Sequence, residues 1–299
     1  MNRLNYEKVF KTLVEETGNY LVNHSLRAMV LGVSGGIDST VVAAICCEVN
    51  KQTNIPLIGQ SLPIKNKKDE FDVSKLVGEA FCNNFDVANL YDEYKCFLSG
   101  LVWREERIDL LDDTETMHPE KSKQQTLIAN GNIQARLRMI YLYNLASIHN
   151  GLVMSTDNQT EYQLGFWTIH GDVGDFDPIQ DLWKTEVYQL AEWLKLFYYT
   201  DGDDADKAVA IGESIKLTPT DGLGISNSDL DQIGAKSYND VDRVLQTLVC
   251  PASPENDRVQ DTLTVEIGPE IIDKIIKRRR NSRFKREKSP IYISREKYE

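Results

Sequence analysis

The segment Gly32-Val-Ser-Gly-Gly-Ile-Asp-Ser-Thr40 constrains this chain more than any other part of the sequence. It stands between a short apolar run, Ala28–Val33, and a helix-like stretch from Val41 to Val49. Such an apolar run is typical of a buried parallel strand. Small residues let the backbone approach a phosphate chain, and a helix start offers unpaired N–H groups with a partial positive charge. The segment therefore predicts a nucleotide-phosphate site at the end of a strand.

The loop lacks the lysine of the ATPase P-loop, whose motif ends Gly-Lys-Ser/Thr and whose lysine contacts the β- and γ-phosphates. Asp38 stands in the corresponding neighbourhood. A carboxylate beside phosphates is tolerable when a divalent cation lies between them, so we predict that Asp38 is a Mg²⁺ ligand. The alternative is a plain Gly/Ser-rich turn in which Asp or Ser caps the helix.

Strands alternate with helices along much of the chain, which favours an α/β fold: an open parallel sheet with helices on both faces. We expect a single domain over residues 1–299, with an irregular segment at 91–123 that mixes aromatic and acidic residues without clean period. Strands are predicted at 28–33, 55–62, 85–90 and 152–155. Helices are predicted at 5–23, 41–49, 69–80, 124–148, 181–196, 204–215, 228–233, 240–248 and 268–280.

Composition excludes several classes of protein. The 299 residues carry a net charge of -12, which argues against a whole-surface nucleic-acid binder. The longest strongly apolar run is far shorter than the roughly 20 residues that span a bilayer. Charged residues interrupt the N-terminal stretch where a signal peptide would be apolar, and the five cysteines show no metal or redox spacing. We therefore expect a cytoplasmic protein with structural thiols.

A basic segment ends the chain. Residues 273–299 hold 11 basic and 4 acidic side chains, so the rest of the chain carries -19. Such a segment is either a nucleic-acid arm or a part that folds over an anionic ligand.

A second candidate block, Leu152-Val-Met-Ser-Thr-Asp-Asn-Gln-Thr-Glu161, also follows a predicted strand. Ligands of open α/β sheets bind beyond the carboxyl ends of the strands. Thr156 is placed to hydrogen-bond a nucleotide, and Glu161 to give the metal a second carboxylate. The Gly-rich stretch 165–175 that follows has the length of a mobile active-site cover.

These motifs resemble those of known proteins. The Ser-Gly-Gly-x-Asp-Ser signature resembles that of the PP-loop ATP pyrophosphatases, which cleave ATP between the α- and β-phosphates to give AMP and pyrophosphate. Within that superfamily the chain resembles the ammonia-dependent NAD synthetase family, with an adenine nucleotide alpha hydrolase-like sheet. The motifs that carry the resemblance are Ser34–Thr40, Gly131–Met139, Thr156–Glu161 with Gly165-Phe166, Gly171-Asp172 and Lys285-Arg286. They follow one another in the family's order, and the resemblance as a whole spans roughly residues 5–286.

The resemblance implies a ligase that forms a C–N bond, joining ammonia to deamido-NAD at the expense of ATP, in a homodimer that binds deamido-NAD partly across its interface. It places Mg²⁺ against Asp38 and Glu161. It places ATP against Gly32, Val33, Ser34, Gly35, Gly36, Ile37, Asp38, Ser39, Thr156, Lys184 and Thr220. It places deamido-NAD against Asn132, Arg136, one loop acid (Asp175 or Asp177), Phe284 and Lys285.

The helical positions of four basic or polar residues bear on these assignments. Asn132 and Arg136 are four residues apart, so on a helix they share a face. Arg138 points elsewhere, and we expect it to form a solvent or interface ion pair. Lys184 falls in the first turn of its helix, where the dipole disfavours an ammonium, which hints at a phosphate partner.

The chain departs from the family pattern at two positions. Ile169 and Phe284 stand where the family often has Lys and His, so two dinucleotide contacts are expected to be lost or replaced by stacking. The basic residues 277–280 and 283–286 are expected either to close over the dinucleotide's pyrophosphate or to form a solvated helix end.

The expected chemistry is an acyl-adenylate route. The nicotinate carboxylate attacks the α-phosphorus of ATP, and ammonia then attacks the activated carbonyl. Ammonium must lose a proton first, and Asp172 in the covering loop is our candidate base. Only about 25 residues precede the first strand, too few for a glutaminase domain, so free ammonia is the expected nitrogen donor unless a separate subunit delivers it.

Two other functions remain open at this stage. A tRNA-modifying PP-loop enzyme should have a basic body or a reactive cysteine pair, and this chain has neither. A non-catalytic ATP-binding module would have no need of both Asp38 and Glu161. No nucleic-acid or membrane partner is expected.

Overall fold

The computed structural model describes residues 4–108, 119–200, 204–219, 229–249 and 263–287, with the side chains of 101–108 and 119–124 left aside. Its centre is a parallel four-stranded sheet in the order β3-β2-β1-β4. The strands are β1 (Ala28–Gly32), β2 (Leu57–Ser61), β3 (Asn84–Val87) and β4 (Gly151–Met154). All four strands expected from the sequence are present, and the predicted α/β sheet is confirmed.

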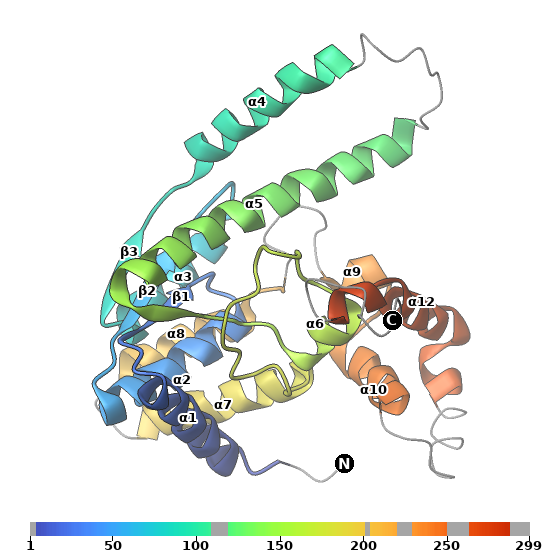
Figure 1. Ribbon diagram of the computed structural model, residues 1–299. Coiled ribbons are helices and arrows are strands. Elements are labelled where there is room, and N and C mark those ends of the chain that lie inside the picture. Colours follow the sequence, from blue (N-terminus) through green and yellow to red (C-terminus); the bar gives the residue numbers. More distant parts are fainter. Residues whose placement is uncertain (1–3, 109–118, 201–203, 220–228, 250–262, 288–299) are drawn as a thin grey trace, which may run out of the picture.

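Helices cover both faces of the sheet (Figure 1). On one face lie α2 (Ile37–Thr53) and α3 (Lys68–Phe81), which are covered in turn by α1 (Tyr6–Asn23), α7 (Lys184–Thr200) and α8 (Ala205–Lys216). On the other face α5 (Pro119–His149) packs against β1 and β4. The prediction of helices on both faces is therefore confirmed.

Strand β1 shows why these residues form a central strand. Met29 and Leu31 belong to the large apolar core on the α2 side. Ala28 and Val30 belong to a smaller core under α5. Successive side chains of a strand point to opposite faces, so a continuous apolar run is what a strand buried on both faces requires.

The prediction of an irregular segment at 91–123 is wrong for the residues that the structure describes. Residues Tyr91–Ile108 form helix α4, and α5 begins at Pro119 rather than near residue 124. Figure 1 shows α4 beside the first half of α5, with both projecting from the body. Two apolar side chains of α4, Tyr94 and Leu98, pack in a small cluster with α5 and the residues after β2, and they form only a narrow stripe, which explains the missing period. Across the described residues no helix is long and apolar enough to cross a membrane.

A second group of helices packs together beside the sheet. It consists of α6 (Gln159–Leu164), which precedes α7, and of α9 (Asp229–Ile233), α10 (Tyr238–Val249), α12 (Pro269–Asn281) and a 3₁₀ turn, Arg283–Arg286, which follow α8. Their shared core includes Leu164, Val241, Val244, Leu245 and Ile275. We call this group the C-terminal helical cluster. Because α6 follows β4 directly, the cluster is attached to the sheet close to the end of that strand.

The glycine loop after β1 contains a position that only glycine tolerates. Gly35 has φ +84°, in the left-handed region, and a Cβ there would lie 2.7 Å from the backbone N of Ser74. Any larger residue would therefore be strained and would collide with α3.

We predict that Gly35→Ala destabilises the protein by about 2 kcal/mol or more, because it adds a clash to backbone strain. Urea unfolding would measure this. Gly100→Ala is the matched control: Gly100 lies in α4 with nothing within 4 Å of a new Cβ, so alanine should raise stability by a fraction of about 1 kcal/mol. Equal stability of Gly35→Ala and the wild type would contradict this account of the loop.

Candidate active site

The site lies where the chain changes direction across the sheet. From β1 the chain builds outward through β2 to β3, then returns to place β4 on the other side of β1. The loops after β1 and β4 therefore diverge from neighbouring strands and leave a crevice at their carboxyl ends. The glycine loop follows β1, and Ser155–Asn158 follow β4.

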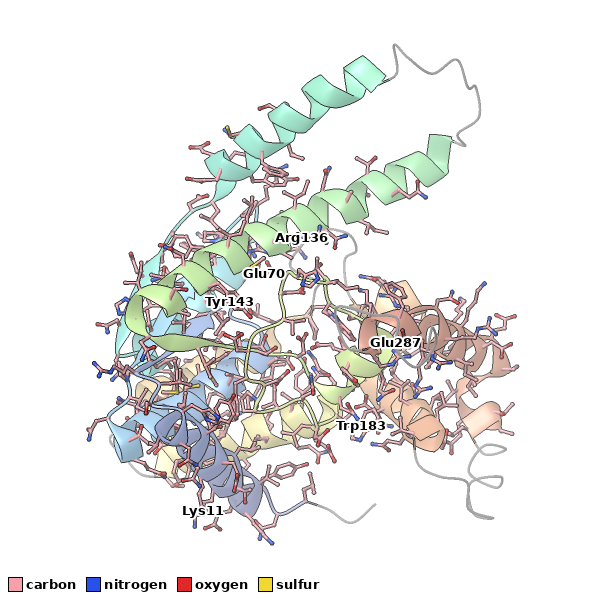
Figure 2. All side chains as sticks on the ribbon, in the orientation of Figure 1. Lys11, Glu70, Arg136, Tyr143, Trp183 and Glu287 are labelled. Carbon is pink, nitrogen blue, oxygen red and sulfur yellow. The ribbon has the colours of Figure 1, made fainter. Side chains whose placement is uncertain are left out.

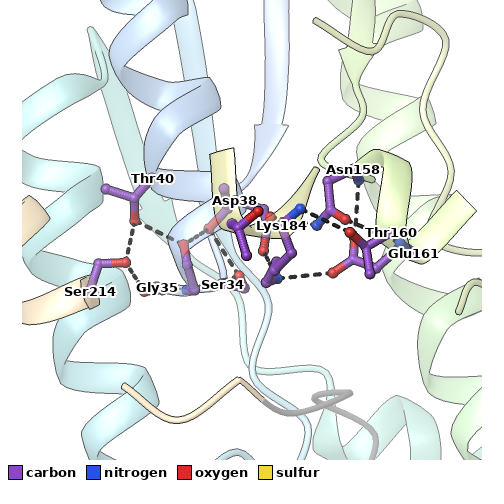
Figure 3. A network of polar contacts seen from close by, with 12 residues as sticks. Ser34, Gly35, Asp38, Thr40, Asn158, Thr160, Glu161, Lys184 and Ser214 are labelled. Atoms are coloured by element: carbon purple, nitrogen blue, oxygen red, sulfur yellow. Dashed lines mark hydrogen bonds and ion pairs between the residues drawn. The ribbon is translucent and has the colours of Figure 1, made fainter. Parts of the chain in front are cut away.

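The glycine loop leads into the first turn of α2. Gly36 is the N-cap, the Gly36 N–H donates to Ser34 Oγ at 3.2 Å, and Ser34 Oγ lies 2.9 Å from Ser39 Oγ. From behind, Ser214 of α8 donates its hydroxyl to Gly35 O at 2.8 Å and accepts one from Thr40 (Figure 3). The loop is thus braced, while its free side and the start of α2 face a cavity, as an anion site requires.

That cavity has a volume of about 630 Å³. A second cavity of about 250 Å³ shares Ser34, Asn66, Thr156 and Asp172 with it, so the two adjoin. Most of the predicted site residues line one or both of them. These are Gly32, Val33, Ser34, Gly36, Ile37, Asp38, Ser39, Asn132, Thr156, Glu161, Asp172, Lys184 and Lys285. The structure therefore brings together the residues of the glycine loop, the second block and the basic tail.

The charged centre consists of Asp38, Glu161 and Lys184. Lys184 Nζ lies 2.5 Å from Asp38 Oδ2 and 3.0 Å from Glu161 Oε1, and the lysine is 2% exposed (Figure 3). Three segments distant in the sequence meet here: the start of α2, the start of α6 and the start of α7. Burial alone would lower the pKa of Lys184, but the two carboxylates more than offset it and raise the pKa well above its usual value. Lys184 is therefore a permanent cation at neutral pH.

Asn158 is a site residue that the sequence reasoning missed. It caps α6 by accepting from Glu161 N at 3.1 Å, while Glu161 Oε2 accepts from Asn158 N at 3.2 Å. Its amide also donates to Asp38 Oδ1 at 2.8 Å. Asn158 thereby holds both carboxylates that were predicted to bind the metal, Asp38 through its side-chain amide and Glu161 through its backbone N–H. The Asn-x-x-Glu spacing of a capping box was the signal that could have found it.

The donor set around the charged centre suits Mg²⁺, which prefers oxygen ligands and keeps several waters and substrate phosphate oxygens in its shell. Asp38 and Glu161 both contact the same ammonium group, so both also lie close enough to share one small cation. Among the residues that the structure describes, no group of three or more His, Cys, Asp or Glu is arranged to hold a metal. A metal bound by Asp38 and Glu161 would therefore take its remaining ligands from phosphate and water.

Two further carboxylates lie beside this charged centre. Asp157 and Asp172 line the cavity, and Asp172 Oδ1 accepts from Thr168 N at 2.6 Å. Burial raises the pKa of Asp157 well above its usual value, and Asp172 and Glu161 add to the effect. Asp172 opens onto the cavity, yet desolvation by the surrounding protein raises its pKa, while the hydrogen bond from the Thr168 N–H and the charges of Lys285 and Arg138 oppose that rise. A raised pKa makes Asp172 a better proton acceptor near neutral pH.

Helix α5 reaches the covering loop at several places. Asn132 Oδ1 accepts from Thr168 Oγ1 at 2.7 Å, and Arg136 donates to Ile169 O at 3.2 Å. The two residues share the face that the four-residue spacing predicts, and Figure 2 shows Arg136 on α5 above this loop. Asn132 lines the cavity, whereas Arg136 holds the outer side of the loop.

Arg138 corrects the sequence analysis, which expected it in a solvent or interface ion pair. Its Nε donates to Leu62 O at 3.0 Å and its Nη2 to Asn66 Oδ1 at 3.1 Å. Burial lowers the pKa of Arg138 to about 10, partly offset by Asp172 and Glu70. The guanidinium lines the smaller cavity and is a buried positive charge next to Asp172. The spacing along the helix predicts that Arg138 lies on a different face from Asn132 and Arg136. It does not predict which backbone carbonyl lies opposite that face.

Three predicted dinucleotide or nucleotide residues are placed differently from the others. Asp175 accepts from Tyr143 at 3.0 Å and from Val153 N at 3.2 Å, so it ties the loop to α5 and β4 and does not line the cavity. Phe284 is 53% exposed on the 3₁₀ turn. Thr220 lies outside the described residues. The roles given to these three residues stay predictions.

Several side chains of the basic C-terminal segment hydrogen-bond carbonyl groups at the end of α6. Arg278 donates to Leu164 O at 3.1 Å, Arg286 to Gln163 O at 2.7 Å, and Lys285 to Gly165 O at 2.7 Å. Cations at the carboxyl end of a helix neutralise its partial negative charge. Arg278 and Lys285 nevertheless line the cavity, so their positive charge also faces any ligand there.

Comparisons with known proteins agree with this geometry. The sequence profile of the family described as NAD synthase matches residues 9–289. This chain belongs to the NAD synthase family. The NH(3)-dependent NAD(+) synthetase of Methanococcoides burtonii is 31% identical over 92% of this chain and 90% of its own length. That of Thermoplasma acidophilum is 35% identical over 72% of this chain and 75% of its own length.

Solved structures show the same fold. NMN synthetase from Francisella tularensis aligns with a TM-score of 0.72 over 98% of this chain and 100% of that chain, at 23% identity. The NH3-dependent NAD synthetase from Campylobacter jejuni aligns with a TM-score of 0.67 over 97% and 100%, at 22% identity. At these identities the likeness concerns the fold.

Asp177 carries a testable consequence for stability. Burial raises its pKa to about 7, and its Oδ2 has no hydrogen-bond partner within the described ranges. The folded state thus holds this proton more tightly than the unfolded state does. The carboxyl group therefore weakens folding increasingly as pH rises from about 4 to about 7.

We predict that Asp177→Asn raises the free energy of unfolding by on the order of 2 kcal/mol at about pH 8, and by little at about pH 4. Thermal or urea unfolding at both pH values would measure it. Asp181→Asn, which removes one charge from an exposed side chain, is the control for a general charge effect. An equal gain at both pH values would contradict the assigned cause.

Proposed function

We propose that this chain is an ammonia-dependent NAD synthetase. It amidates deamido-NAD with ammonia, consumes ATP, and releases NAD, AMP and pyrophosphate. The observation that carries the proposal is the meeting of Asp38, Glu161 and Lys184 beside the start of α2, in a chain of the NAD synthase family. The relatives named NH(3)-dependent NAD(+) synthetase, matched over most of both chains, support the choice of ammonia and of this acid substrate.

The proposed first step activates the acid. A nicotinate carboxylate oxygen attacks the α-phosphorus of ATP, the bond between α-phosphorus and the bridging oxygen breaks, and pyrophosphate leaves with that bond's electrons. The glycine loop and the start of α2 bind the phosphates, and Lys184 orients them as a fixed cation. Mg²⁺, when bound by Asp38 and Glu161, would neutralise charge that develops on the phosphates.

The proposed second step forms the amide. Ammonia attacks the activated carbonyl and AMP leaves. Because ammonia is mostly ammonium at neutral pH, a base is needed, and Asp172 lies at the cavity wall with a raised pKa. The covering loop, held to α5 through Thr168 and Ile169, excludes water that would otherwise hydrolyse the adenylate.

We expect purified protein with ATP, Mg²⁺, deamido-NAD and ammonium chloride to form AMP, pyrophosphate and NAD in equal amounts. Nicotinate mononucleotide in place of deamido-NAD tests whether the adenylate half of the dinucleotide is required. Product analysis by liquid chromatography distinguishes these outcomes. ADP as the product, turnover that needs tRNA, or no turnover with either acid would contradict the proposal.

Two variants sharpen this experiment. Asp38→Asn should abolish turnover, because it removes a carboxylate from the charged centre. Asp172→Asn should lower kcat by about 100-fold or more at saturating ammonium, as expected for a lost general base. Full turnover of Asp172→Asn would remove that residue from the mechanism.

We also propose that the protein acts in the cytoplasm as a homodimer. The described cysteines (46, 47, 82 and 96) are free thiols, in keeping with a reducing compartment. Two isoleucines of α5, Ile140 at 60% and Ile148 at 67% exposure, present apolar surface that a second subunit would cover. Analytical ultracentrifugation should give a dimer that Ile140→Arg weakens, and a wild-type monomer at micromolar concentration would contradict the expected dimer.

A further inference from the structure

A buried carboxylate in the C-terminal helical cluster is not used by the chemistry proposed above. Asp242, on α10, is 2% exposed. Its Oδ1 accepts from Thr160 Oγ1 at 2.5 Å, and its Oδ2 accepts from the Thr185 N–H at 2.9 Å. Both partners belong to other helices, α6 and α7.

A second link completes this arrangement. The Thr160 hydroxyl oxygen also accepts from the Lys184 N–H at 2.9 Å. Helix α7 begins at Lys184, and the first N–H groups of a helix have no partner inside the helix. Asp242 therefore caps α7 from outside, directly at Thr185 and through Thr160 at Lys184. A carboxylate at this end also interacts favourably with the helix dipole.

The capped residues adjoin the charged centre. Thr160 immediately precedes Glu161, and Thr185 immediately follows Lys184. One carboxylate therefore binds the side chain next to Glu161 and the backbone N–H next to Lys184, the two residues of the ion pair drawn in Figure 3. Helix α10 contributes a second contact, since Lys184 Nζ lies 5.5 Å from the centre of the Tyr238 ring. Tyr238 and Asp242 are four residues apart and so share a face of α10.

We propose that Asp242 is a positioning residue for nucleotide binding: it holds Lys184 and Glu161 in register and thereby makes that part of the site depend on the C-terminal helical cluster. This inference rests on the proposed function for the identity of the nucleotide. Asp242 touches no atom that reacts. It acts through the Thr160 hydroxyl and through the N–H groups of Lys184 and Thr185.

The chemistry of the partners explains why a carboxylate stands here. The Thr160 hydroxyl and the Thr185 N–H both donate to Asp242, and a carboxylate only accepts. An asparagine would keep one acceptor but turn an NH₂ group toward a donor. Burial raises the pKa of Asp242, and the hydrogen bonds of Thr160 and Thr185 oppose that rise. Asp242→Asn is therefore a close match in size that breaks the cap.

The first experiment measures the cap without any ligand, by hydrogen exchange of the peptide that contains residues 183–187. We expect Asp242→Asn to speed exchange there at least tenfold. Val244→Ala is the matched control, because Val244 lies on the same helix, is 1% exposed and belongs to the apolar core of the cluster. Equal exchange in the two variants, at equal loss of thermal stability, would overturn the proposal.

The second experiment measures binding of a non-hydrolysable ATP analogue with Mg²⁺ by calorimetry. We expect Asp242→Asn to weaken binding at least tenfold, and Val244→Ala to leave it within twofold. In steady-state assays the KM for ATP should rise while the KM for ammonium stays constant. An effect on kcat alone, or the same effect on every substrate, would overturn a positioning role at the nucleotide.

Thr160 provides a second route if Asp242→Asn fails to fold. Thr160→Val keeps the size and removes the hydroxyl, and it should weaken analogue binding as Asp242→Asn does, while Thr160→Ser restores it. Failure of wild-type protein to form an amide would refute the proposed function, whereas the exchange experiment would still decide the role of Asp242. Unchanged exchange and unchanged binding in Thr160→Val would overturn the role.

Discussion

The site depends on placing one ammonium group between two carboxylates inside the protein. Burying a charge is unfavourable unless its partners compensate, and removing one partner leaves an uncompensated charge that costs about 3–5 kcal/mol. Lys184 at 2% exposure is compensated by Asp38 and Glu161, and Asn158 holds both of those acids. The starts of α2, α6 and α7 are therefore fixed relative to one another by charge.

This constraint explains how a catalytic centre can be preorganised. Two carboxylates and one ammonium leave a net negative charge, which favours a further cation. The glycine loop and the start of α2 next to them favour an anion. A metal–nucleotide complex carries both kinds of charge and satisfies both sides. The neighbouring carboxylates Asp157 and Asp172, whose pKa values are raised by burial, extend the negative side toward the covering loop.

The parts of the fold that the sequence predicts well are those decided by local pattern. The apolar run before Gly32 predicts a strand buried on both faces, and the small residues Ser34–Ser39 predict a tight loop into a helix, so the loop and the helix start that line the cavity were predictable. Helix α4 was missed because it packs through a small apolar cluster and lacks a wide apolar face. Its exposed Phe97 and its acidic first turn break the apolar periodicity, so the sequence there resembles that of an irregular segment.

Residues that act through distant partners escaped prediction for another reason. Arg138 meets the carbonyl of Leu62, 76 positions away, and Asp242 meets Thr160, 82 positions away. No local pattern encodes which backbone groups a fold brings within reach of such a side chain. Asn158 is intermediate, because its capping box is local but its contact with Asp38 is not.

Local and distant contacts also have different roles in this site: the first form the binding features, and the second fix their positions. Groups set by local pattern, such as the glycine loop and the α6 cap, create the binding features themselves. Groups set by tertiary contact, such as Ser214 behind the loop, Arg138 beside Asp172 and Asp242 under Lys184, fix where those features lie. Motif residues alone would therefore not reproduce the site on another scaffold, because α8 and α10 hold the three helix starts that meet at the ion pair.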